Sequence, residues 1–168
     1  SSMLSNNPHI KETYVGKAAP GVSFYDFKNN RLGIGHKSSD VLAHEMGHAA
    51  SLADASELYK GLLRTSKKLT RLSNNAAIPI AGFIAAYPKL TSEQKRGLLS
   101  NAALASGLIA APNLLEEANA SLKAIYHSPS KLRTGLRMIP GIVSHSSNDL
   151  TAPSTYILAR TLIGGQDD

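Results

Sequence analysis

The sequence predicts a mainly helical protein that forms one domain over residues 1–168, with a small β-hairpin near the N-terminus. The length of 168 residues suits a single hydrophobic core. Alanine, leucine and serine are plentiful, whereas the chain has six tyrosines, three phenylalanines and no tryptophan, which favours closely packed helices. Strand-like alternation is confined to residues 22–35, and apolar residues recur at helical spacing after it.

The N-terminal part is predicted to be extended. Residues 1–20 mix Asn, Pro, Gly and Lys and are interpreted as an irregular lead-in. They lack the apolar run of a signal peptide, so none is expected there, and the composition assigns no compartment. Two alternating runs then flank Asn29-Asn30. Because Asn tolerates the left-handed conformation of tight turns, we expect a β-hairpin over 22–35.

Two helices are predicted to follow the hairpin. The cluster Ser38-Ser39-Asp40 is a favourable N-cap for a helix over 40–53. A second helix, over 55–73, carries much of the formal net charge of +6, on Lys60, Arg64, Lys67, Lys68 and Arg71. We interpret these residues as a solvated face; a surface for an acidic partner is the alternative. No aromatic residue lies between the charges for base stacking, so no nucleic-acid partner is expected.

The middle of the chain predicts an apolar helical hairpin over 75–111. The stretches 72–88 and 97–115 contain no charged residue, and a charged turn separates them. The second stretch has 19 residues, close to the length that spans a bilayer. Polar residues and prolines interrupt both stretches, so buried core helices are the preferred interpretation. Membrane contact through 76–111 is the alternative.

Prolines mark the expected elements of the C-terminal third. Pro112 suits the first turn of a new helix, predicted over 112–126. Residues 128–149 contain Pro, Gly, Ser and Asn and predict a short helix with loops. Pro153 is expected to open a last helix that runs to about residue 163 and ends at Gly164-Gly165.

The motif His44-Glu45-Met46-Gly47-His48 carries the chemical hypothesis. Residues i and i+4 lie one turn apart on the same helix face, so both imidazoles can bind one metal ion. Glu45 lies about 100° around the helix, where it flanks the metal and can act as general base. The chain has no cysteine, so a metal must bind to His, Asp or Glu.

Glu117 is the predicted third metal ligand. An open zinc site uses three protein ligands and a water. Glu117 interrupts an apolar helix, and Ala120 and Ala124 share its face, where small side chains allow close approach to the first histidine helix. Glu116, about 100° away, is the alternative ligand; otherwise it stays solvated or orients a neighbour.

Together, His44-Glu-Met-Gly-His48 and Glu117-Ala-Asn-Ala120-Ser121-Leu-Lys-Ala124 resemble the gluzincin metallopeptidases. The likeness is to the HtpX, CaaX prenyl protease and YugP-like group, whose pattern is Glu-x-x-Ala-(Asp or Ser)-x-x-Ala. It covers about 35–55 and 112–126. The resemblance implies a compact zincin-like domain that binds Zn²⁺. Many relatives carry Asp where Ser121 stands, so this chain is expected to tune its metal differently.

The resemblance also implies a strand at the rim of the cleft, just before the histidine helix. Residues 31–35 suit that exposed edge, to which a substrate peptide would add. A plain hairpin strand without this role is the equal alternative. The developing oxyanion needs a further donor besides zinc. His145 and Tyr156 are the candidate catalytic residues for this role, with His127 and Arg133 as weaker ones.

The predicted function is a zinc-dependent endopeptidase that cleaves peptides or partly unfolded protein. Zinc activates the water, Glu45 takes its proton, and His44, His48 and Glu117 hold the metal. Two alternatives remain: a catalytically inactive metalloprotease-like binding module, and a membrane-associated structural protein built around the hairpin.

Overall fold

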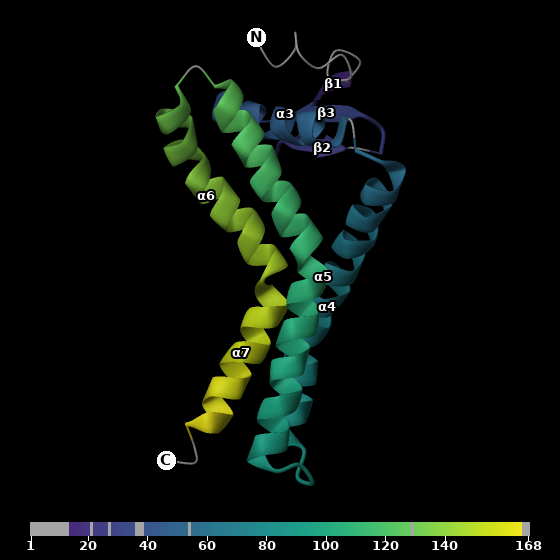
Figure 1. Cartoon of the computed structure of the whole chain (residues 1–168), viewed down its shortest axis with the longest axis vertical. Helices are drawn as coiled ribbons and strands as arrows, with labels where there is room; N and C mark the ends of the chain where they lie inside the picture. The colour runs from purple at the N-terminus through teal and green to yellow at the C-terminus, as the bar shows by residue number, and fades with distance from the viewer. Residues whose placement is uncertain are drawn as a thin grey trace. The chain divides into compact units, whose positions relative to one another are not determined.

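A computed structural model describes residues 14–20, 22–26, 28–35, 39–53, 55–128 and 130–165. Within them the chain is mainly helical with one small sheet, as predicted, and Figure 1 shows the elements in chain order. The prediction of irregular structure over residues 1–13 falls outside this part. Contacts divide the chain into two compact units. Residues 1–60 and 115–145 form the first unit, and residues 61–114 and 146–168 form the second.

The first unit contains a three-stranded sheet. Its strands are β1 (Tyr14–Lys17), β2 (Phe24–Asp26) and β3 (Arg31–Ile34), in the order β1-β3-β2. β2 and β3 form the predicted antiparallel hairpin, and Asn30 adopts the left-handed conformation with φ of 47°. β1 pairs with β3 in parallel and was not predicted, because a four-residue strand between turn residues gives little periodicity.

The sheet order corrects the prediction that residues 31–35 form an exposed edge. β3 lies in the centre, hydrogen-bonded to β1 on one side and to β2 on the other. A peptide therefore cannot add to β3. β3 also packs against α3, and its Leu32 is only 4% exposed.

Helix α3 (Ser39–Ala53) carries the histidine motif and packs against β2 and β3. Ala49 and Ala50 of α3 are buried beside Tyr25. On another side α3 meets α5 (Ser92–His127) so closely that a Cβ atom on Gly47 would overlap the backbone carbonyl of Ala120. The prediction that small residues allow this approach is confirmed.

Two helices are longer than predicted. α4 (Glu57–Ala86) continues through Pro79, and α5 continues through Pro112, so no new helix begins at Pro112. An internal proline removes one hydrogen bond and crowds the preceding turn, but its fixed φ is helical. Buried residues on both sides hold each helix together: Ala77 and Ala81 around Pro79, and Ala110 and Asn113 around Pro112.

Helix α6 (Lys131–Asp149) replaces the predicted short helix with loops. Its Gly and Pro residues disfavour a helix locally, but tertiary packing outweighs propensity. In the first unit Met138 is buried against Ala124 of α5. Helix α7 (Thr151–Gly164) matches the predicted last helix, with Gly165 at its C-cap.

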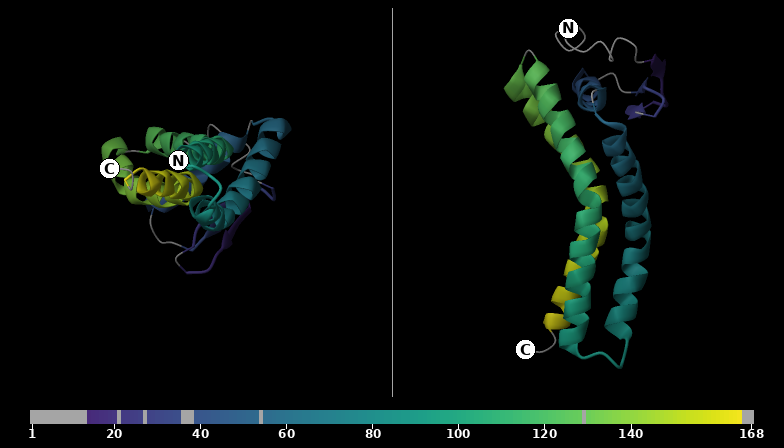
Figure 2. Two further views of the ribbon diagram at one scale, coloured as in Figure 1. Left: turned by 90° about the horizontal axis from the view of Figure 1, so that it is seen from below. Right: turned by 45° about the vertical axis from the view of Figure 1, so that its right-hand side comes forward.

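The second unit is built from three antiparallel helical segments. The C-terminal part of α4 and the N-terminal part of α5 run side by side and are joined by the turn at 87–91, and α7 lies beside α5 (Figures 1 and 2). Their shared core is small: Ala77, Ala81, Leu99, Ala152 and Tyr156.

The close approach of α3 and α5 predicts the effect of adding one methyl group. Gly47→Ala forces the two helices apart and is expected to lower the free energy of unfolding by about 1–3 kcal/mol. Gly61→Ala is the matched control, because nothing lies within 4 Å of a Cβ atom there, and it is expected to stabilise slightly. Chemical denaturation followed by circular dichroism measures both. Equal effects of the two substitutions would contradict the packing described here.

Candidate metal centre

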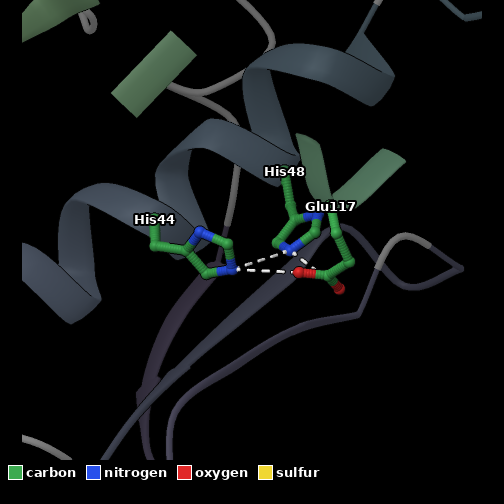
Figure 3. Close-up of side chains that lie close together, drawn as sticks. All are labelled: His44, His48 and Glu117. Atoms are coloured by element: carbon green, nitrogen blue, oxygen red, sulfur yellow. Dashed lines mark hydrogen bonds and ion pairs between the residues drawn. The ribbon is translucent and has the colours of Figure 1, made fainter. Parts of the chain in front are cut away.

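His44 and His48 lie one turn apart on α3, and their Nε2 atoms are 3.2 Å from each other. Glu117 reaches the same point from α5 (Figure 3). One carboxylate oxygen is 3.3 Å from His44 Nε2, and the other is 3.6 Å from His48 Nε2. The three predicted ligands therefore converge, with their ligand atoms within 4.8 Å of one another.

These separations fit a tetrahedral metal site. Zinc lies about 2.0–2.2 Å from nitrogen and oxygen ligands, so the ligand atoms of a tetrahedral site are about 3.4 Å apart. The three closest distances in the cluster, 3.2, 3.3 and 3.6 Å, bracket that value. The cluster is also secluded: His44 is 9% exposed and His48 is 8% exposed.

The outer nitrogens of both imidazoles face acceptors. His48 Nδ1 lies 3.2 Å from Glu116 Oε1, and a carboxylate only accepts. His44 Nδ1 lies 3.4 Å from Ser121 Oγ, whose own hydroxyl donates to the backbone oxygen of Glu117 at 2.7 Å. Both Nδ1 atoms are therefore donors, and each imidazole, in its neutral form, presents the lone pair of Nε2 to the centre. Two such nitrogens and a carboxylate that meet at one point favour positive charge there, either a proton on one ring or a metal ion.

Glu116 is held by a small network of its own. It is 2% exposed, and Oε2 accepts a hydrogen bond from Ser51 Oγ at 2.9 Å. Ser51 Oγ in turn accepts from Asn119 Nδ2 at 2.6 Å. Of the alternatives for Glu116, the structure places it as the residue that orients His48, not as a solvated charge or a ligand at Nε2.

The electrostatics of the metal-free site centre on His48. Burial by itself lowers the pKa of this imidazole, but hydrogen bonds to Glu116 and Glu117 and the charges of Glu117 and Glu45 outweigh it, and the pKa is raised to about 9. A proton on His48 therefore supplies positive charge beside the carboxylates. A metal that binds there must displace it.

Glu45 is 5% exposed, and its charge acts on His48, so it lies within electrostatic reach of the centre. The other predicted catalytic residues are placed differently. Tyr156 belongs to the second unit, where it is buried in the core against Ala77 and Leu99. His145 lies in α6, and its side chain is outside the described part.

The weaker candidates lie at the end of α5 and near the start of α6. His127 ends α5 and packs edge-on against the ring of Tyr126. Arg133 is an exposed residue near the start of α6. The oxyanion donor predicted from the sequence is therefore not identified by contacts at the described site.

Sequence reasoning missed Ser51 and Asn119. A signal existed for each: Ser51 follows His44 by seven residues and His48 by three, and Asn119 follows Glu116 by three, so each lies on the face of its helix that carries the cluster. Lys123, also missed, donates to the backbone oxygen of Ala50 at 2.8 Å and ties α5 to the last turn of α3.

No protein-family model, curated protein or solved structure matches the chain. The likeness to the gluzincins therefore stays a prediction that rests on the motif residues.

The raised pKa of His48 predicts how metal binding depends on pH. A metal binds only the neutral imidazole, and below about pH 9 the metal-free site holds a proton there. The apparent metal affinity is expected to rise about tenfold per pH unit toward pH 9 and to level off above it. Competition with a chelator of known affinity, repeated across this pH range, measures the apparent metal affinity. An affinity that levels off near the ordinary histidine pKa of about 6.5 would contradict the role of the carboxylates.

Glu117 and Glu116 are expected to respond differently to loss of charge. Glu117→Gln removes a ligand and should weaken zinc binding by about 100-fold or more. Glu116→Gln keeps an acceptor for His48 Nδ1 and should weaken zinc binding by about tenfold. Because the substitution removes a negative charge beside His48, it should also lower the pH at which the metal affinity levels off. Zinc titration of both variants, with the exposed Glu57→Gln as control, decides the assignment. A larger effect of Glu116→Gln would reverse it.

Proposed function

We propose that the protein is a zinc-dependent endopeptidase of the gluzincin type. One observation supports this most: the Nε2 atoms of His44 and His48 and the carboxylate of Glu117 meet at one point, while separate acceptors hold both Nδ1 atoms. Three ligands of this kind leave one coordination position open, as in catalytic zinc sites and unlike closed structural ones. The His/Glu donor set suits zinc, although other divalent metals accept the same ligands.

Zinc bound there would lower the pKa of a water molecule and polarise a carbonyl group. The residues of the protein itself would transfer protons and orient the metal ligands. Glu45, next to His44 in the motif, accepts the proton of the attacking water and returns it to the leaving amine. Glu116 and Ser121 fix the ring orientations through the Nδ1 atoms. Burial of the cluster keeps these electrostatic interactions strong.

The outer strands of the sheet offer an edge to which a substrate could bind. β1 and β2 are the outer strands of the three-stranded sheet, and of these β2 packs against α3. An extended peptide that adds to the outer edge of β2 by main-chain hydrogen bonds would run beside the helix that carries the metal ligands. We therefore assign substrate alignment to β2 in place of residues 31–35. Unfolded polypeptide is the substrate class that can form such a strand.

Glu45→Gln tests the proposal. The variant keeps the size and hydrogen-bonding shape of the side chain but cannot take a proton, so hydrolysis of an unfolded protein should fall by about 100-fold to 10,000-fold. Zinc content measured by elemental analysis should stay at the wild-type value, because Glu45 is not a ligand. Glu57→Gln, an exposed carboxylate paired with Lys60, should leave both unchanged.

The outcomes separate the competing functions. A wild-type protein that holds stoichiometric zinc but hydrolyses no faster than Glu45→Gln is a metal-binding module without turnover. A protein that binds no divalent metal at all overturns the metal centre as well as the enzyme.

A further inference from the structure

The outer surface of the second unit is strongly apolar. Large side chains on its three helices point away from the core and are 61–73% exposed: Ile78, Phe83, Leu104, Leu108, Leu158 and Leu162. A water-soluble protein rarely exposes a continuous apolar area larger than a few hundred Å². These residues are spread over α4, α5 and α7, so the apolar surface belongs to the whole unit and not to one helix.

The core of the same unit is made of small residues. Ala77, Ala81 and Ala152 are at most 5% exposed, and Leu99 and Tyr156 are the larger members of the cluster. This arrangement, with small side chains inside and large ones outside, reverses the order of a soluble helical bundle. It is typical of helices in a membrane, where lipid is as apolar as leucine and close backbone approach provides the packing.

Hydrogen bonds between helices supply further cohesion in the second unit. Ser66 of α4 donates to the backbone oxygen of Ile109 at 2.6 Å, and Asn113 donates to Thr70 at 3.3 Å. Asn74 donates to the backbone oxygen of residue 148 at 2.6 Å and accepts from the backbone of residue 152 at 3.0 Å. Polar contacts between helices, of which the one from Asn113 to Thr70 is buried, join helices where no hydrophobic effect drives them together.

Charged residues of the second unit lie at the two ends of its helices. One end carries the exposed basic residues of α4: Arg64, Lys67, Lys68 and Arg71. The other carries the turn between α4 and α5 and the end of α7, with Lys89, Lys95, Arg96 and Arg160. Figures 1 and 2 show that this turn and the C-terminal end of α7 lie at the same end of the unit, and the Arg96 side chain lies near Gly164.

The apolar zone between these ends is close to bilayer thickness. It comprises residues 72–86 of α4 and 97–114 of α5, which at 1.5 Å per residue are about 22 and 27 Å long. The hydrocarbon core is about 30 Å thick, and lysine and arginine side chains at both ends extend outward to the headgroups. In α5 an 18-residue window has a mean hydropathy of 1.4, and only 28% of it is buried. A core helix of a soluble protein would be mostly buried.

We propose that the second unit inserts into a lipid bilayer, with the α4–α5 hairpin crossing the hydrocarbon core, α7 packed beside it, and the basic residues at both ends bound to anionic headgroups. The surplus of positive charge at both ends favours lipid over a second copy of this chain, since two copies would bring like charges together. This proposal replaces the interpretation of 76–111 as a buried core hairpin. It does not depend on the metal centre.

Flotation of the purified full chain with vesicles of phosphatidylcholine and phosphatidylglycerol tests insertion. The protein should rise with the vesicles and stay with them after washes in high salt and in alkaline carbonate, because its attachment is hydrophobic. Leu104→Arg places a charge in the middle of the apolar zone and should lower the floated fraction more than tenfold. Leu58→Arg, at an exposed leucine of the first unit, should leave it unchanged. Release of the wild type by salt alone overturns insertion.

A second measurement does not depend on how well a variant inserts. The chain has no cysteine, so a single introduced cysteine carries a single fluorophore. A label at Phe83→Cys or Leu104→Cys should be quenched by nitroxide groups on lipid acyl chains and not by aqueous iodide. A label at Glu93→Cys, an exposed residue at the hairpin turn, should respond in the opposite way. If the Leu104 label is shielded from iodide in a lipid-free oligomer and acyl-chain nitroxides do not quench it, a second copy covers this surface and the proposal is wrong.

Discussion

The close approach of α3 and α5 at Gly47 and Ala120 is the constraint on which the first unit depends. With no side chain at Gly47 and only a methyl group at Ala120, the two backbones come into contact. At that distance the short side chains of two consecutive glutamates reach the same imidazole from opposite edges. Glu116 contacts Nδ1 of His48 and Glu117 lies at Nε2. A larger residue at either position would separate both carboxylates from the ring.

The charge balance of this contact explains why the site suits a cation. Two buried carboxylates beside His48 form an arrangement that is costly unless positive charge is present. In the metal-free protein a proton on His48 supplies that charge, which is why the pKa of this imidazole is raised. A divalent metal would supply more of it and would also use the lone pair of His44. We therefore expect the carboxylates to keep a proton on His48 in the absence of metal and to favour metal binding in its presence.

Both units bring helices together through buried alanines. In the first unit, polar groups at a helix crossing are satisfied by one another and by the histidines. Large apolar side chains face outward in both units, but in the second they lie along the charge-free stretches 72–86 and 97–114. Such a stretch is unfavourable in water and favourable in hydrocarbon, which supports the proposed insertion of the second unit.

The sequence by itself determined the elements that local spacing controls. It predicted the histidine helix, the hairpin with its left-handed Asn30, and the last helix, because periodicity and turn preferences act over a few residues. It also singled out Glu117, whose position beside the histidines depends on the packing of α5 against α3. Tertiary structure decided what depends on distant partners. It placed β3 in the centre of the sheet, carried α5 through Pro112, and turned Glu116 from a candidate surface charge into the residue that orients His48. These outcomes depend on which surfaces pack together. The free energy of tertiary packing outweighs local conformational propensities, and the sequence pattern reports only those propensities.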